Sequence, residues 1–440
     1  MFQSFRTFRT KLIKPGTLHQ PGGFHRQIGG VFLAGLLAMG LVSPAMALGG
    51  GVAKEEASQP AAPQPVPVPV PVPEPITNPT PVPAPSGPTT AAGSDEGACN
   101  NGDLVACTRL GVAYEFGDDG LTRDYGRAAE LFLRACTGGE KQACNNLGFM
   151  YQKGWGFEKN PVMARTLYQT ACDGGNMKGC NNLGFAYENG MGLEQNYNAA
   201  YGLYQRACDG GNMSGCNNVG YLLQYGLGVP VDNGRAVRYY ETACDGGNPN
   251  ACNNLGYMYE YALGVPEDYA RARQLFEKSC VGNTTDGCNN LGYMYQHALG
   301  VAEDMGLAFT YFKRSCDAGV NAGCNNLGYL YQHALGVAED FGQARRLYSI
   351  ACEGGNASGC NNLGYMDVNG LGGPSDGASA LAYYARSCEI GNGLGCNELG
   401  FLYYQGTAGV RDLAKAREYF QRACSNGNQQ GCDNAASMGN

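Results

Sequence analysis

Histidine is scarce in this chain of 440 residues, which contains only four. His19 and His25 lie near the N-terminus, and the other two, His297 and His333, lie 36 residues apart. A zinc enzyme needs several histidine or carboxylate ligands around an open coordination position. The two distant histidines do not supply such a set. We therefore expect no metal and no cofactor, and we interpret His297 and His333 as solvated edge residues rather than general bases.

Basic residues are outnumbered. The chain has 30 lysines and arginines against 38 acidic residues. Five of the basic residues lie within residues 1–27, which hold no acid, so the remainder has a formal net charge of −13. A nucleic-acid-binding protein is expected to show a basic patch or a high pI. This balance excludes nucleic acid as a predicted partner and disfavours tight binding to anionic lipid.

Cysteine, in contrast, is abundant and strictly spaced. Twenty cysteines form ten Cys-x₇-Cys pairs, and from Cys136 onward the first member of each pair recurs every 36 residues. A fixed period in the thirties indicates supersecondary units that bury their apolar faces on their neighbours. A Cys-only zinc site would need four thiolates that converge from closely spaced pairs. The spacing here favours disulfides over a zinc array.

Two pairing schemes are open, because sequence alone does not fix connectivity. Pairing across a helical hairpin, such as Cys144 with Cys172, would leave Cys99 and Cys432 unpaired. Pairing within each Cys-x₇-Cys unit closes all ten pairs across a short glycine-rich turn. The favoured scheme is Cys99–Cys107, Cys136–Cys144, Cys172–Cys180, Cys208–Cys216, Cys244–Cys252, Cys280–Cys288, Cys316–Cys324, Cys352–Cys360, Cys388–Cys396 and Cys424–Cys432.

The N-terminal residues 1–47 have the pattern of a secretory signal peptide. A basic region precedes the apolar run Val31–Val42, and Ala45-Met46-Ala47 fits a small-residue cleavage site. The alternative is an uncleaved anchor, although about 20 apolar residues are needed to span a bilayer. Export to a secreted or periplasmic location in a bacterial cell envelope would allow the disulfides to persist.

Residues 48–98 are rich in proline, with 13 of the 21 prolines of the chain. Such a composition cannot build a core and favours the extended polyproline II conformation. We interpret this segment as a disordered linker. The alternative is that it docks in an aromatic groove on a partner.

Residues 99–440 are predicted to form an all-α solenoid of about nine repeats. In the repeat that begins at Cys252, Leu255, Gly256 and Tyr259 continue a helical stripe. Gly256 within that stripe suggests that a second helix crosses too closely for a side chain. Asp268 is the expected N-cap of that second helix, whose buried face is predicted to include Phe276. Each repeat is therefore expected to be an antiparallel helix pair, and the pairs to stack in a right-handed array.

The motif Leu255-Gly256-x-x-Tyr259, followed by Gly264, Asp268 and Ala272, resembles Sel1-like repeats, which are relatives of the tetratricopeptide repeat. Together with the cysteine pairs, the repeats are similar to the Helicobacter cysteine-rich protein family. The resemblance implies an exported, disulfide-bridged solenoid. It also implies penicillin binding or β-lactamase activity, with a β-lactam or peptidoglycan fragment as ligand.

If the pairs pack as in tetratricopeptide repeats, one face of the first helix of each pair lines the concave groove. It carries the first asparagine after each cysteine, the aromatic residue four positions later, and the residue three positions beyond that, such as Gln152 or Glu188. Asparagine amides can both donate to and accept from a peptide backbone, and the aromatic rings add contact area. The alternative is that the asparagines cap turns or bond the backbone of the next repeat, with the aromatic rings as interface core. For the second asparagine of each repeat, such as Asn146 and Asn182, that alternative is favoured. The candidate groove residues are Asn145, Asn181, Asn217, Asn253, Asn289, Asn325, Asn361, Asn397, Phe149, Phe185, Tyr221, Tyr257, Tyr293, Tyr329, Tyr365 and Phe401.

The residues give little direct support for an enzymatic function. A serine β-lactamase needs Ser-x-x-Lys, in which a base activates the nucleophile. No lysine after residue 47 has a serine three positions before it. The predicted function is thus a scaffold that binds a protein or an extended peptide, and the hydrolase rests on resemblance alone.

Overall fold

The computed structural model describes residues 92–282, 285–407, 409 and 411–438. The predicted signal peptide and most of the predicted linker lie outside these residues. The first helix begins at Ala92, inside the range assigned to the linker, and it carries Cys99. The helical array therefore starts before the first cysteine.

The described residues form twenty helices and no strand. Most are twelve or thirteen residues long, and the first and last are shorter. The helices are α1 (Ala92–Asn100), α2 (Leu104–Phe116), α3 (Tyr125–Thr137), α4 (Lys141–Lys153), α5 (Pro161–Asp173), α6 (Met177–Glu188), α7 (Tyr197–Asp209), α8 (Met213–Tyr225), α9 (Asn233–Asp245), α10 (Pro249–Glu260), α11 (Tyr269–Val281), α12 (Thr285–Gln296), α13 (Met305–Asp317), α14 (Asn321–Gln332), α15 (Phe341–Glu353), α16 (Ala357–Asn369), α17 (Gly377–Glu389), α18 (Gly393–Gln405), α19 (Leu413–Ser425) and α20 (Gln429–Ser437).

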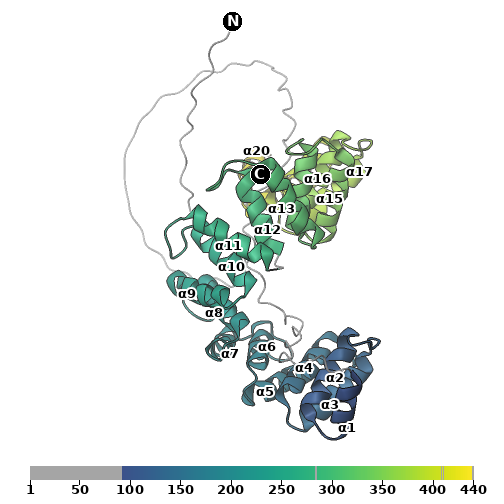
Figure 1. Ribbon diagram of the computed structural model, residues 1–440. Helices are drawn as coiled ribbons and strands as arrows, with labels where there is room; N and C mark the ends of the chain where they lie inside the picture. Colours follow the sequence, from purple (N-terminus) through teal and green to yellow (C-terminus); the bar gives the residue numbers. More distant parts are fainter. Residues whose placement is uncertain (1–91, 283–284, 408, 410, 439–440) are drawn as a thin grey trace, which may run out of the picture.

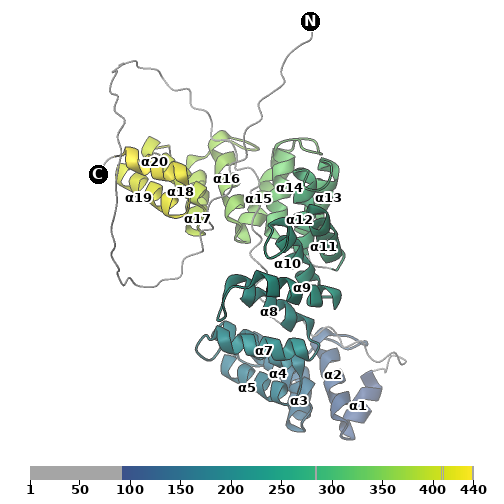
Figure 2. The same cartoon turned by 90° about the vertical axis from the view of Figure 1, so that its left-hand side faces the viewer.

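The helices stack in chain order as an α-solenoid, which confirms the predicted fold class (Figure 1). Nine antiparallel pairs run from α2 with α3 to α18 with α19, and α1 and α20 cover the two ends. We call the even-numbered helix of each pair the first helix and the odd-numbered one the second. Successive first helices, such as α10 and α12, contact each other more extensively than successive second helices do. The array therefore curves with its first helices on the inner side (Figure 2).

A close crossing holds the two helices of a pair together. A Cβ atom on Gly256 of α10 would lie 2.6 Å from the Phe276 ring of α11. The absence of a side chain at Gly256 thus lets the ring pack directly on the backbone, as the sequence predicted. Asp268 caps α11 by accepting a hydrogen bond from the backbone N–H of Arg271, which satisfies one of the free donors at the helix start.

The turn between pairs depends on glycine and asparagine. After α5, Gly175 has φ of +87°, a left-handed conformation that side chains disfavour. Asn176 then caps α6 by accepting from the backbone N–H of Gly179. These two residues reverse the chain within a few positions and bring Cys172 close to Cys180.

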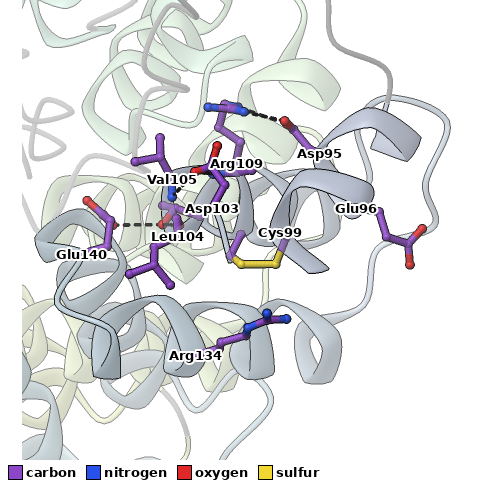
Figure 3. The surroundings of a disulfide bond; sticks show 12 residues. Asp95, Glu96, Cys99, Asp103, Leu104, Val105, Arg109, Arg134 and Glu140 are labelled. Atoms are coloured by element: carbon purple, nitrogen blue, oxygen red, sulfur yellow. Dashed lines mark hydrogen bonds and ion pairs between the residues drawn. A yellow bond between two sulfur atoms is a disulfide. The ribbon is translucent and has the colours of Figure 1, made fainter. Parts of the chain in front are cut away.

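A disulfide closes every such turn. The ten bonds join each second helix to the next first helix, with Cα–Cα distances of 4.4–4.7 Å. At the start of the array, Cys99–Cys107 joins α1 to α2, next to an ion pair between Arg109 and Asp95 (Figure 3). Asp103 caps α2 in the same turn. Ten disulfides are typical of a protein in an oxidising extracellular or periplasmic compartment.

Three loops between paired helices hold an alanine in a left-handed conformation. Ala262, Ala298 and Ala334 have φ of 54–56°, where most other repeats have a glycine such as Gly190. An L-residue pays a steric cost there, because its Cβ approaches the following carbonyl oxygen. Repeats five to seven therefore carry local backbone strain.

Within the described ranges, no helix has both the length and the apolar character required to cross a bilayer.

Candidate functional site

The two asparagine rows form a ladder between repeats. In each step the amide Nδ2 of a second asparagine donates to Oδ1 of the first asparagine in the preceding repeat, at 2.8–3.0 Å. The pairs are Asn182 to Asn145, Asn218 to Asn181, Asn254 to Asn217, Asn290 to Asn253, Asn326 to Asn289, Asn362 to Asn325 and Asn434 to Asn397. The first asparagines are at most 5% exposed.

The ladder changes how the first asparagine row is interpreted. We expected these amides to line an open groove, but the structure places them in the interface between repeats. Apart from Asn361, their Oδ1 atoms accept a hydrogen bond from the following repeat, and little of their surface is open to a ligand. The second asparagine also lies between repeats, as favoured from the sequence, but Asn182 and its equivalents bond a side chain of the preceding repeat rather than the backbone of the next one.

The ladder is interrupted at two points. Glu398 stands where the second asparagine of repeat nine would be, and Oδ1 of Asn361 is buried without a hydrogen-bond partner. At the other end, Thr108 replaces the first asparagine of repeat one, and the Nδ2 of Asn146 has no partner. A continuous ladder thus runs only from Asn145 to Asn362.

The aromatic row is partly exposed from Tyr221 onward. Phe149 and Phe185 are buried, whereas the later members are half-buried. On α10, Tyr257 is turned roughly 100° about the helix axis from Gly256, the residue that touches α11. Tyr261, four residues further, is turned roughly 140° from Gly256. Tyr261 therefore points mainly away from the second helices, toward the inner side of the array, and Tyr257 lies at the flank of that face.

A second ring pairs with each tyrosine of the row from Tyr221 to Tyr329. Ring centroids lie 4.9 Å apart for Tyr221 and Tyr225, 4.4 Å for Tyr257 and Tyr261, and 4.2 Å for both tyrosine–histidine pairs. We define the aromatic stripe as the eight residues on and just after α8, α10, α12 and α14. They are Tyr221, Tyr225, Tyr257, Tyr261, Tyr293, His297, Tyr329 and His333.

Half of this stripe was not predicted from the sequence. The spacing of four residues after each tyrosine was the available signal, since residues i and i+4 share a helix face. It places Tyr225 and Tyr261 beside the predicted row. The same spacing places His297 and His333, which were interpreted as solvated edge residues, in ring contact with Tyr293 and Tyr329.

The stripe is uncharged at neutral pH. Burial lowers the pKa of His297 and of His333, against the opposing effects of Glu303 and Glu339. Burial also raises the pKa of the tyrosine hydroxyls, including Tyr261. The surface therefore offers flat rings with neutral hydroxyl and imidazole groups, which suits apolar contact combined with hydrogen bonds.

A row of glutamate and glutamine side chains lies seven positions after the first asparagine of repeats two to seven, or after Thr108 in repeat one, and all of them except Gln224 are buried. Four of its members accept hydrogen bonds from tyrosines of the second helices. The pairs are Tyr168 with Gln152 (2.6 Å), Tyr204 with Glu188 (2.6 Å), Tyr240 with Gln224 (2.8 Å) and Tyr348 with Gln332 (2.8 Å).

Burial changes the acidity of this row. It raises the pKa of Glu115, Glu188 and Glu260 to about 7. Where phenylalanine replaces the tyrosine, the row loses a donor. In the repeat of Glu115 the second helix carries Phe132 instead of a tyrosine, and the Oε1 of Glu115 is buried without a hydrogen-bond partner. The buried carboxyls are therefore supports beneath the stripe rather than exposed acids.

The described residues contain no group of three or more histidine, cysteine, aspartate or glutamate side chains able to hold a metal ion. All twenty cysteines are in disulfides. The side-chain arrangement with the clearest capacity for recognition is thus the aromatic stripe.

Comparisons with known proteins agree with this geometry. The Sel1 repeat model matches nine segments: residues 104–140, 141–176, 178–212, 214–248, 249–280, 285–320, 321–356, 357–392 and 393–428. No curated protein matches the chain.

Two solved structures illustrate the likeness. A Sel1 repeat protein from Oxalobacter formigenes is 25% identical, with a TM-score of 0.50 over 56% of this chain and 96% of that one. A protective antigen of uropathogenic Escherichia coli is 26% identical, with a TM-score of 0.47 over 79% of this chain and 82% of that one. Since the Sel1 repeat model covers most of the described residues, the chain belongs to the Sel1 repeat family.

Proposed function

We propose that this protein is an exported scaffold that binds a protein or an extended peptide on the inner face of the solenoid, with the aromatic stripe as its contact surface. Sel1 and tetratricopeptide-like solenoids typically act as protein-interaction scaffolds, which supports the general class. The specific observation behind the proposal is the recurrence of two rings at one register on four successive first helices.

The form of the surface suits an extended ligand. Tyrosines provide large contact area with few rotatable bonds, so little side-chain entropy is lost when a partner binds. Tyr225 and Tyr261 are 41% and 39% exposed, well above the neighbouring core residues. Successive pairs repeat along the array, so a linear chain would meet similar contacts at each step.

Export is the second part of the proposal. The support for it is the basic leader with its short apolar run and the ten disulfides, which persist in oxidising compartments. Intact mass of the mature protein tests it: cleavage after Ala47 gives an N-terminus at Leu48. A membrane-bound chain that retains Met1 would show an uncleaved anchor instead.

Binding can be tested with a phage-displayed library of random linear peptides. The native protein should enrich a set of peptides, and Tyr257→Ala combined with Tyr293→Ala should lower their recovery about tenfold, since loss of two aromatic anchors typically costs more than 1 kcal/mol. Tyr404→Ala is the matched control, because Tyr404 is 43% exposed on α18 but lies off the stripe. Equal recovery by all three proteins would overturn the proposal.

No observation in the described residues favours the β-lactam or peptidoglycan alternative. If the native protein hydrolysed nitrocefin and the same stripe substitutions abolished the hydrolysis, the proposed scaffold function would be wrong and the hydrolase function would take its place.

A further inference from the structure

We propose that the aromatic stripe is covered by the proline-rich segment of the same chain, residues 60–88. This inference rests on the proposed function, because it assigns a first occupant to the same surface.

The chemistries of the two surfaces match. Proline-rich segments in the polyproline II conformation dock on aromatic-lined grooves, where the pyrrolidine rings pack on aromatic faces. Proline lacks a backbone N–H, so such a segment presents mainly carbonyl acceptors. Tyrosine hydroxyls of the stripe can donate to those carbonyls, although the Tyr261 hydroxyl also bonds the Glu260 carboxyl. Tyr225 and Tyr261, each about two-fifths exposed, provide the most open tyrosine rings.

The length of the chain outside the described residues is sufficient. In polyproline II the stretch from Pro60 to Ala92 would reach about 100 Å, at about 3.1 Å per residue. Packed helices lie about 10 Å apart, so six steps from α2 to α14 require about 60 Å. α1 lies at one end of the array and the stripe in its middle (Figure 2). The segment can therefore cross the first repeats and still cover the stripe.

The periods of the two structures also agree. One turn of polyproline II advances about 9.3 Å, from three residues at about 3.1 Å each. The spacing of packed helices is about 8–10 Å. Each turn of the segment would therefore meet the ring pair of one further repeat, such as Tyr257 with Tyr261 and then Tyr293 with His297.

Charge does not oppose this docking. Residues 60–88 contain one ionisable side chain, Glu74, although the chain beyond the leader is strongly acidic. The stripe itself has no fixed charge among its eight residues. A neutral proline-rich segment thus approaches a neutral surface, and contact depends on ring packing and hydrogen bonds. An external peptide would then have to displace the segment, which makes the segment an intramolecular competitor.

Hydroxyl-radical footprinting of the full mature chain tests this inference. The comparison is with a variant of equal length in which Pro65, Pro67, Pro69, Pro71 and Pro73 are each changed to serine. A tethered segment has an effective concentration in the millimolar range, so a Kd of about 0.1 mM would give about tenfold protection. Oxidation of Tyr225 and Tyr261 should therefore rise about tenfold in the variant, while that of Tyr404 stays unchanged.

Two further measurements complete the test. A synthetic peptide of residues 60–88, added to the serine variant, should restore the protection of Tyr225 and Tyr261. Equal oxidation of these tyrosines in both chains would overturn the inference. Protection that grows with protein concentration would assign the segment to a second copy and overturn the intramolecular form.

Failure here is distinguishable from failure of the proposed function. If the two chains have equal footprints but library peptides still bind in a stripe-dependent way, only the intramolecular occupant is rejected.

Discussion

The hydroxyl of Tyr204 donates a 2.6 Å hydrogen bond to the buried carboxyl of Glu188. In neighbouring repeats the same contact joins a tyrosine to a glutamine, as in Tyr168 with Gln152 and Tyr240 with Gln224. Glu188 is therefore an ionisable member of a series whose other bonded members are neutral amides. Its charge state must affect the stability of its repeat.

Stability should fall as the pH rises through the range set by Glu188. The folded state holds the pKa near 7, whereas the ordinary value is about 4.5. Between these values unfolding releases a proton, so rising pH favours unfolding, and the loss is complete above about pH 7. Glu188→Gln should raise the free energy of unfolding at pH 8 by up to about 3 kcal/mol and change it little at pH 4.

Denaturant unfolding at pH 4, 6 and 8 checks this prediction. Gln224→Glu is the matched reverse variant and should introduce an additional loss of stability over the same pH range. A Glu188→Gln protein whose stability relative to the native chain is the same at pH 4 and pH 8 would contradict the assignment.

The asparagine ladder should contribute to stability. Asn253→Ala, Asn289→Ala and Asn325→Ala together would leave three buried amide donors of the following repeats without acceptors. Each unpaired donor should cost about 1–3 kcal/mol, so the melting temperature should fall. Asn198→Ala is an exposed control on α7. An unchanged melting temperature with weakened peptide binding would instead return these asparagines to the binding surface.

The strained alanines predict a stabilising substitution. Ala262→Gly removes the cost of a left-handed L-residue, at the expense of a more flexible unfolded chain. The net gain should be about 0.5–1 kcal/mol in thermal or denaturant unfolding. Gly190→Ala at the equivalent loop should have the opposite effect, because a Cβ there would meet no atom closer than 3.4 Å and only the backbone strain would act. If Ala262→Gly instead lowered the free energy of unfolding, the methyl group of Ala262 would contribute more to stability by packing than its backbone strain costs.

The disulfides should stabilise each junction separately. Replacing Cys244 and Cys252 with serine should cost about 2–4 kcal/mol, a typical value for removal of a native disulfide. Since each repeat contacts only its neighbours, hydrogen exchange should increase mainly in α9 and α10. Peptide mapping of the unreduced native chain should recover Cys244 linked to Cys252. A Cys252–Cys280 link would contradict the pairing.

Much of the fold within one repeat could be predicted from the sequence. Gly256 indicated a close helix crossing, and Asp268 indicated the start of the next helix, because both depend on backbone rules that hold within one repeat. The role of Asn253 was harder to predict, since a helical period cannot distinguish a groove face from a face against the next repeat. The available signal was the offset of one residue between the paired asparagines, which the bond from Asn290 to Asn253 requires.

The row of glutamate and glutamine three positions beyond the aromatic row was expected on the groove face, and that prediction was wrong because most of these side chains are buried. Glu188 looks like a solvent-facing acid when its helix is considered alone. Only the partner tyrosine on the second helix, Tyr204, shows that the carboxyl lies in the interior. One sequence pattern indicates this packing. Glutamate exchanges with glutamine on the first helices, and tyrosine exchanges with phenylalanine on the second helices.

The position of the disulfides determines where a protease can divide the molecule. A cut between Cys172 and Cys180 would leave its two fragments covalently joined through the bond that spans that turn. A cut in the loop between α10 and α11 would leave two fragments with no covalent link, because the disulfides on either side, Cys244–Cys252 and Cys280–Cys288, do not span it. In a compartment that contains proteases, the integrity of this protein therefore depends on the short loops within each helix pair, while breaks in the turns between pairs are tolerated until a reductant is present.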